Sequence, residues 1–263
     1  MIHMKRLRFS LILAITAVIL CSVPCYPDSF GKTLYRSLSA KLGRERADYP
    51  GLNDAEFANF RMVTTSGIAP GKLYRSSSPI STWGNRNIIA DKFAASADIK
   101  TFINLADTDE GIKSHKGYTG SYYSTRKFTG LNLGMKYGSA DFRRKLAGGF
   151  HFMAVNEPPY LIHCSLGKDR AGFVCAVIEC LNGASWDEVE RDYMASFRNY
   201  FGILPGTREY DFIVRKEIRR FIAENFGIKT PETANLPAAA RGYLLGMGVS
   251  SDDIESIRRK LGG

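Results

Sequence analysis

The chain has 263 residues, of which 44% are hydrophobic and 24% are charged. This balance predicts a folded globular chain and excludes the disordered, collagen-like and coiled-coil classes. The formal net charge is +10, but the sequence contains no block of five or more Lys and Arg residues, so we expect no nucleic-acid partner.

The first 25 residues have the pattern of a secretory signal peptide. Three basic residues precede an apolar run over residues 11–20, whereas a membrane-spanning helix needs about 20 apolar residues. Cleavage after Cys25 fits this pattern; a lipoprotein site at Cys21 or Cys25 is the alternative, which the residue before each cysteine disfavours. We therefore expect an exported protein, periplasmic or secreted, whose mature chain carries no transmembrane anchor.

The mature chain stays basic and has few cysteines. Without residues 1–25 it holds 33 Lys and Arg against 26 Asp and Glu, a net charge of +7, which favours an anionic partner. Its cysteines are Cys164, Cys175 and Cys180, an odd and sparse set that does not form a disulfide framework. Cys175 and Cys180 lie in one apolar run and are interpreted as small core residues.

Hydrophobic periodicity predicts one domain after a basic N-terminal segment. We assign residues 26–56 to that segment and residues 57–263 to the domain. Short apolar or alternating runs predict strands at residues 60–63, 73–76, 101–105 and 159–163. Helical spacing predicts helices at residues 85–98, 139–155, 171–181, 185–200 and 209–226, and a closing helix pair over 236–261. Strands that alternate with helices predict an α/β fold, with a central mostly parallel sheet flanked by helices and a helical C-terminal tail.

The most informative stretch is residues 163–172, with the sequence His-Cys-Ser-Leu-Gly-Lys-Asp-Arg-Ala-Gly. A strand is predicted to end at Cys164 and an apolar helix to begin near Arg170, with a tight loop between them. This geometry presents successive backbone N–H groups to an anion. Gly167 permits close approach of the backbone to a ligand, and Arg170 offers a planar fork for two phosphate oxygens. The same positive field favours a nucleophilic thiolate at Cys164.

This stretch resembles the signature of the cysteine-dependent tyrosine phosphatase superfamily, His-Cys-x5-Arg. The Gly-Lys-Asp-Arg version is similar to a bacterial branch whose members act on phosphotyrosine and often on phosphoinositides. Further segments resemble that branch in the same order along the chain: residues 59–61, 70–76, 99–105 and 243–261. The resemblance covers about residues 57–261.

The resemblance implies a metal-independent phosphatase with no cofactor, whose substrate is a phosphorylated protein or an inositol phosphate. Cys164 would attack phosphorus and form a phosphocysteine, while loop N–H groups and Arg170 hold the equatorial oxygens. Water would then hydrolyse this intermediate. Further substrate contacts are implied for the loop residues His163, Ser165, Leu166, Gly167 and Lys168.

Three of the basic residues have two interpretations each. His163 would orient and polarise Cys164 from behind the loop, or it is a structural histidine at the end of a strand. Lys168 would extend the positive field toward a second phosphate, or it is a solvated loop lysine. Arg75 faces the site or forms a structural ion pair.

The general acid is implied less directly. No Asp lies near Asn132, where many members carry the acid on a separate loop. Asp169 is the acid that the Gly-Lys-Asp-Arg branch implies, and its alternative role is to position the loop by accepting from backbone N–H groups. Asp107, Asp109 and Asp141 are the other candidates.

One departure from the family pattern, together with the missing acid loop, leaves room for other functions. Ala171 stands where most members carry a hydroxyl residue that assists phosphocysteine breakdown, so either Ser165 substitutes or the second step is slow. A non-catalytic phosphate-binding pseudo-phosphatase is therefore the alternative.

Residues 107–109 also resemble the Asp-x-Asp motif of magnesium-dependent haloacid-dehalogenase phosphatases, but Gly111 stands where that motif wants Thr or Val. Arsenate reduction or sulfur transfer would need a resolving cysteine on mobile backbone, which Cys175 in an apolar helix does not provide.

Overall fold

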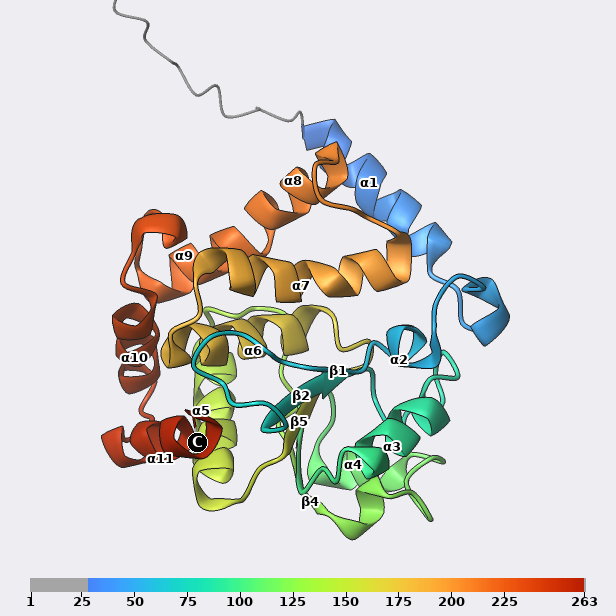
Figure 1. Cartoon of the computed structure of the whole chain (residues 1–263), viewed down its shortest axis with the longest axis horizontal. Coiled ribbons are helices and arrows are strands. Elements are labelled where there is room, and N and C mark those ends of the chain that lie inside the picture. The colour runs from blue at the N-terminus through green and yellow to red at the C-terminus, as the bar shows by residue number, and fades with distance from the viewer. Residues whose placement is uncertain (1–27, 263) are drawn as a thin grey trace, which may run out of the picture.

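A single five-stranded sheet organises the molecule (Figure 1). The computed structural model describes residues 28–262, so the predicted signal peptide lies outside the described residues. The strand order is β1-β2-β5-β3-β4, and only β1 runs antiparallel to its neighbour. The strands are β1 (Arg61–Met62), β2 (Leu73–Ser76), β3 (Thr101–Asn104), β4 (Lys127–Gly130) and β5 (Tyr160–His163). The predicted α/β fold with a mostly parallel sheet is confirmed.

Helices cover both faces of this sheet. The α-helices are α1 (Asp28–Lys41), α2 (Asp54–Phe57), α3 (Asn87–Ser96), α4 (Asp109–Ser114), α5 (Ala140–Val155), α6 (Asp169–Asn182), α7 (Trp186–Phe201), α8 (Arg208–Lys216), α9 (Ile218–Phe226), α10 (Leu236–Gly246) and α11 (Ser251–Gly262). Short 3-10 turns lie at η1 (Arg46–Asp48), η2 (Tyr123–Thr125) and η3 (Pro231–Thr233). None of the helices among residues 28–262 is long and apolar enough to cross a membrane.

The side chains of the central strands alternate between two hydrophobic cores. Phe102 and Leu161 point to the core shared with α3, α4 and η2. Ile103 and Ile162 point to the larger core shared with α5 and α6, behind which α7, α9, α10 and α11 pack. Strands buried on both faces read as continuous apolar runs, which is why these segments were recognisable as strands in the sequence.

Three features differ from the sequence-based expectations. β4 was not predicted, because its residues lack both an apolar run and an alternating pattern. The helix expected over residues 209–226 is divided into α8 and α9 at Glu217, where φ is −113° and ψ is −95°. The Glu217 carboxylate accepts hydrogen bonds from the hydroxyls of Tyr35 (2.5 Å) and Tyr193 (2.6 Å) at this break.

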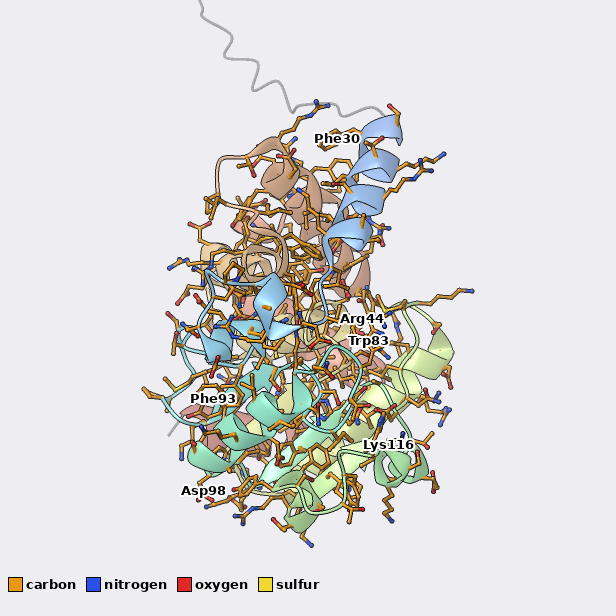
Figure 2. The ribbon with its side chains drawn as sticks, turned by 90° about the vertical axis from the view of Figure 1, so that its right-hand side faces the viewer. Phe30, Arg44, Trp83, Phe93, Asp98 and Lys116 are labelled. Carbon is orange, nitrogen blue, oxygen red and sulfur yellow. The ribbon has the colours of Figure 1, made fainter. Side chains whose placement is uncertain are left out.

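The N-terminal segment is the third difference, because it is helical and packed where the sequence indicated only a basic stretch. Phe30 of α1 packs on Phe212 of α8, with ring centroids 5.1 Å apart. Further along, the Arg44 guanidinium lies 5.5 Å from the centre of the Trp83 ring. Figure 2 shows this pair close together, with Phe30 at the far end of the segment. The segment therefore runs along one side of the domain and makes contacts at both ends.

Candidate active site

The loop between β5 and α6 (residues 164–168, called the β5–α6 loop) begins at the carboxyl end of the central strand. β5 pairs in parallel with β2 on one side and β3 on the other. Cys164 follows directly and is 3% exposed. α6 starts at Asp169, so the positive end of the helix macrodipole is adjacent to the loop. Both features favour an anion near Cys164.

The carbonyl groups in the first half of the β5–α6 loop point outward into the surrounding protein. The backbone N–H of Ser78 donates to the carbonyl oxygen of Ser165 (3.1 Å). The carbonyl oxygen of Leu166 accepts from Asn59 Nδ2 (3.1 Å) and from the Tyr200 hydroxyl (2.7 Å). Side chains from distant parts of the chain thus fix the direction of these peptide groups.

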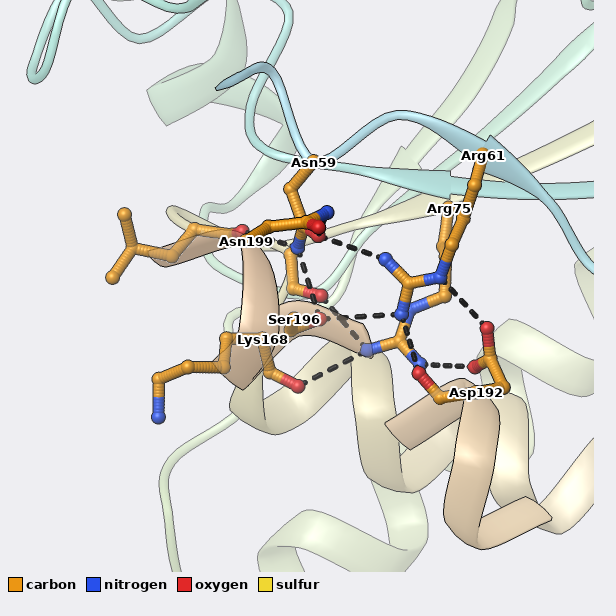
Figure 3. A network of polar contacts seen from close by, with 9 residues as sticks. Asn59, Arg61, Arg75, Lys168, Asp192, Ser196 and Asn199 are labelled. Atoms are coloured by element: carbon orange, nitrogen blue, oxygen red, sulfur yellow. Dashed lines mark hydrogen bonds and ion pairs between the residues drawn. The ribbon is translucent and has the colours of Figure 1, made fainter. Parts of the chain in front are cut away.

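Arg75 holds the second half of the loop in the same way. Its Nη2 donates to the carbonyl oxygens of Gly167 (2.8 Å) and Lys168 (3.1 Å). Its Nη1 donates to the Asp192 carboxylate (2.5 Å). Figure 3 shows the guanidinium between the loop and Asp192, with Arg61 bound to the other oxygen of the same carboxylate. Arg75 is completely buried, so it supports the loop from behind and forms the structural ion pair considered above.

These outward carbonyls determine where the loop N–H groups point. In a trans peptide unit the N–H is antiparallel to the C=O of the preceding residue. The N–H groups of residues 166–169 therefore face away from the supporting side chains and toward the concave side of the loop. Successive N–H groups on a concave backbone form an anion-binding cradle.

Gly167 is required for this path of the backbone. Its φ is +67°, and a Cβ at this position would lie 2.1 Å from the carbonyl oxygen of Ser76. Only glycine combines this left-handed conformation with such a close approach. The sequence indicated that Gly167 permits close approach of the backbone to a ligand. In the structure, the close approach is to Ser76, on the outer side of the loop.

Arg170 reaches from the first turn of α6 across the carboxyl edge of the sheet. Its Nη1 donates to the carbonyl oxygen of Leu133 (3.0 Å), which lies between β4 and α5. Its Nη2 lies 3.3 Å from the hydroxyl oxygen of Ser165. The guanidinium is thus fixed next to the β5–α6 loop and close to Ser165.

Lys168 and Asp169 form an ion pair within the loop region. The ammonium of Lys168 also lies 4.2 Å from the centre of the Phe197 ring, and this side chain is only 12% exposed. Lys168 is therefore not a freely solvated loop lysine. Its charge lies between Asp169 and an aromatic face, an arrangement that sequence reasoning missed because Phe197 belongs to α7.

His163 is fully buried behind the loop. Its Nε2 lies 3.2 Å from the Tyr123 hydroxyl. Burial lowers the pKa of His163 to about 4, although the nearby Asp107 acts in the opposite direction. The imidazole is thus neutral at ordinary pH, which is compatible with either of the two roles considered for this histidine.

The alternative acids have partners of their own. Asp107 accepts from Asn104 Nδ2 (3.0 Å) and lies 3.3 Å from His115 Nε2. Asp109 accepts from the backbone N–H of Gly130 (2.6 Å). Both follow β3, the neighbour of β5, so they share the sheet edge from which the β5–α6 loop departs.

Asp141 is in a different position, in the first turn of α5. Its carboxylate is 57% exposed and pairs with Arg144 (2.8 Å) and Lys145 (2.9 Å) of the same helix. These hydrogen bonds to Lys145 and Arg144 lower the pKa of Asp141. Both partners lie on α5 itself, and neither belongs to the β5–α6 loop.

The interior of α6 is closed to solvent. Ala171, Cys175 and Cys180 are buried, and Cys164, Cys175 and Cys180 are all free thiols. Burial raises the pKa of Cys175 and of Cys180, so both remain protonated core residues. Among residues 28–262 no cluster of three or more His, Cys, Asp and Glu side chains could hold a metal ion.

A polar network behind the loop is the part of the site that the sequence did not reveal. Asp192 of α7 binds both Arg61 (2.7 Å) and Arg75, and Arg61 also donates to Asn59 (2.8 Å) (Figure 3). Burial opposes ionisation of Asp192, but the two guanidiniums hold its pKa well below the usual range. The sequence signals were Arg75 and the family-like residues 59–61, but their contact with Asp192 was not visible because the partners lie on elements far apart in the chain.

Comparison with known proteins adds family information to this geometry. A family model described as the tyrosine phosphatase family matches residues 55–262. Among solved structures, the chain is similar to the core catalytic domain of the PP-IP phosphatase SIW14 from S. cerevisiae in complex with citrate, with 18% identity and a TM-score of 0.36. That match covers 65% of this chain and 95% of the other. The comparison with curated proteins gives no match.

Proposed function

The chain belongs to the tyrosine phosphatase family, and from this premise we propose that it hydrolyses phosphate monoesters through a phosphocysteine on Cys164. The observation that carries the proposal is the direction of the loop carbonyls. Ser78, Asn59 and Arg75 hold them outward, and this leaves a row of N–H donors facing the side on which phosphate would bind.

In the first step, the thiolate of Cys164 attacks phosphorus and an S–P bond forms as the ester O–P bond breaks. The leaving oxygen takes a proton from Asp169. Loop N–H groups and the Arg170 guanidinium hold the three equatorial oxygens, whose charge they stabilise.

In the second step, water attacks the phosphocysteine and the S–P bond breaks, which releases phosphate and restores the thiolate. Asp169 takes the proton that the water loses. Ala171 is buried and has no hydroxyl to assist this step. We assign this assisting role to the hydroxyl of Ser165, which lies 3.3 Å from Arg170.

We further propose phosphotyrosine and phosphoinositides or inositol phosphates as the substrate class. The support is the Gly-Lys-Asp-Arg sequence of the loop, which resembles the bacterial branch, and the mature charge of +7. The proposed location is outside the cytoplasm, on the basis of the signal-like pattern of residues 1–25.

The decisive experiment compares two cysteine variants in a metal-free assay with an aryl phosphate. Cys164→Ser should lower kcat by more than about 1000-fold, because the nucleophile is lost, and should still bind phosphate. Cys180→Ser is the matched control, since it makes the same chemical change in the buried helix; its kcat should match wild type.

Two results would count against the proposal. Turnover by Cys164→Ser at the wild-type rate would exclude Cys164 as the nucleophile. Wild-type protein that binds phosphate but turns over neither phosphotyrosine peptide nor inositol phosphate would instead establish the phosphate-binding pseudo-phosphatase.

A further inference from the structure

A second basic pocket lies beyond the segment that contacts Arg170. It has a volume of about 430 Å³ and is bounded by residues 135–139, the first turns of α5 and one side of α9. Its lining includes Lys136, Tyr137, Ser139, Arg143, Arg220 and Asn225. None of the residues of the β5–α6 loop lines this pocket.

The charges around the pocket are unbalanced. Arg220 lies 3.6 Å from Glu224, the acidic residue of the lining. Lys136 and Arg143 form no ion pair with any residue in the described part of the chain. Two positive charges therefore remain without a counter-charge among the described residues. The N-terminal end of α5, capped by Ser139, adds its positive dipole to them.

Several polar atoms of the pocket residues also lack partners within residues 28–262. Arg143 Nε and Asn225 Oδ1 are buried and make no hydrogen bond. The cation–π contact of Arg143 with Tyr243, at 5.5 Å, leaves the donors of its guanidinium available. A buried polar atom without a partner is costly. The part of the Arg143 guanidinium that lines the pocket has no carboxylate partner among residues 28–262, so a ligand with phosphate oxygens would supply an acceptor for it.

The same segment connects this pocket to the candidate active site. The Leu133 carbonyl at its start accepts from Arg170. Tyr137 stacks on Phe173 of α6, with ring centroids 4.5 Å apart and planes 9° from parallel. Burial is the main cause that raises the pKa of Tyr137, and the charges of Asp169 and Cys164 raise it further. The wall of the pocket is therefore close to the groups that carry out the proposed reaction.

We propose that this pocket binds a second phosphate group, borne either by the substrate itself or by a separate phosphorylated molecule. The link to turnover rests on the phosphatase function proposed above, whereas binding of the phosphate does not. Arg143 is the central ligand, and Lys136 and Arg220 contribute charge.

The binding experiment isolates the pocket with one equivalent of vanadate, a phosphate mimic that bonds to the Cys164 thiolate and so fills the β5–α6 loop in preference to the pocket. Inorganic phosphate is then titrated into this full-length complex and followed by calorimetry. Wild type should bind one further phosphate, and Arg143→Gln should weaken this binding by about tenfold or more, because a charge-assisted hydrogen bond is lost. Arg144→Gln is the matched control, since Arg144 is the next residue, is 73% exposed and pairs with Asp141.

Equal phosphate affinity in wild type and Arg143→Gln, or equal losses in the Arg143 and Arg144 variants, would overturn the proposal. If vanadate fails to bind, the proposed function fails. The same phosphate titration without vanadate then still shows whether a site that depends on Arg143 exists.

Kinetics distinguish the two sources of the phosphate. If it belongs to the substrate, Arg143→Gln should raise KM for an inositol polyphosphate about tenfold and leave KM for a simple aryl phosphate unchanged. If a separate molecule supplies it, inorganic phosphate should change kcat at saturating aryl phosphate in wild type but not in Arg143→Gln. The absence of both effects would refute a role of the pocket in the reaction.

Discussion

His163 and Cys164 are neighbours in the chain but lie in different surroundings. The imidazole of His163 is buried and neutral, with its Nε2 near Tyr123. The thiol of Cys164 lies at the start of a loop shaped for an anion. The buried neutral ring contributes to the stability of the fold, and this contribution depends on pH.

The low pKa of His163 predicts a loss of stability in mild acid. In the unfolded chain its pKa is 6.5, and burial lowers the folded value to about 4. Between these values the unfolded chain binds a proton that the folded protein does not, so stability falls as pH is lowered from 6.5 toward 4. The full loss from this residue is about 3 kcal/mol.

Urea unfolding of wild type and His163→Gln at pH 7, 5.5 and 4.5 measures this contribution. The glutamine does not titrate and can still reach Tyr123. Subtracting the free energies of unfolding of the two proteins at each pH cancels the contribution of the carboxylates that both contain. Parallel stability curves across this range would show that His163 does not titrate as described.

At this scale, the sequence indicated candidate residues but not the directions of their side chains. Cys164, Gly167 and Arg170 could be proposed from their spacing, because the chemistry of an anion-binding turn constrains them locally. The orientation of Lys168 could not, because it depends on Phe197, which only the packing of α7 brings to the loop.

The elements of the site act through contacts that join β1, β2 and α7. Asp192 on α7 is the common partner of Arg61 and Arg75, and Arg75 in turn holds two loop carbonyls. These strands were predicted from local patterns, but the position of α7 against them depends on long-range packing. That is why this support was not visible in the sequence.

Asp192→Asn should therefore weaken the loop as well as the fold. It removes the carboxylate that pairs with both guanidiniums, of which Arg75 is fully buried and Arg61 is partly exposed, and this costs on the order of 3–5 kcal/mol. Under conditions where the variant remains folded, vanadate binding should also weaken, because Arg75 loses one of its two anchors. Urea unfolding and vanadate titration measure the two effects.

Asp187→Asn on the same helix is the control, since Asp187 is exposed. Its loss should cost no more than about 1 kcal/mol, with vanadate affinity unchanged. If Asp192→Asn lowers stability but keeps wild-type vanadate affinity, the network supports the fold alone and does not position the loop.

Elements defined by strong hydrophobic patterns were predicted best. β5 and most of α6 are buried, so their apolar runs predict them. β4 owes its extended form to pairing with β3, and the break between α8 and α9 coincides with hydrogen bonds to Glu217 from two distant tyrosines. Neither influence is local, so neither left a pattern in the sequence.

On the scale of the whole molecule, one core joins the N-terminal helix to the C-terminal helix. It includes Leu34 of α1, the inner side chains of the sheet, and Ile257 and Leu261 of α11. The closing helix packs on α5 and contributes no residue to the β5–α6 loop. The packing of α11 should thus contribute to stability without a direct part in the chemistry of the loop.

Ile257→Ala tests this separation. Because Ile257 is completely buried, its truncation should lower the free energy of unfolding by about 2–5 kcal/mol. The value of kcat/KM, measured at a temperature where the variant is folded, should stay unchanged. Ile88→Ala is the control, since Ile88 is 76% exposed and its truncation should change stability by less than about 0.5 kcal/mol.

A fall in kcat/KM for folded Ile257→Ala would contradict this division. Urea unfolding followed by circular dichroism gives the free energy of unfolding of both variants, and an aryl phosphate assay gives their kcat/KM.

The central place of β5 has a consequence for the timescales on which the molecule opens. Strands β1 and β4 lie at the edges and can exchange their amide hydrogens through local fraying, whereas β5 is paired on both sides and opens only with the middle of the sheet. The β5–α6 loop is therefore attached at one end to a slowly exchanging strand. Its N–H groups are arranged when the chain folds, so most of the entropy needed to order them is lost before any phosphate arrives.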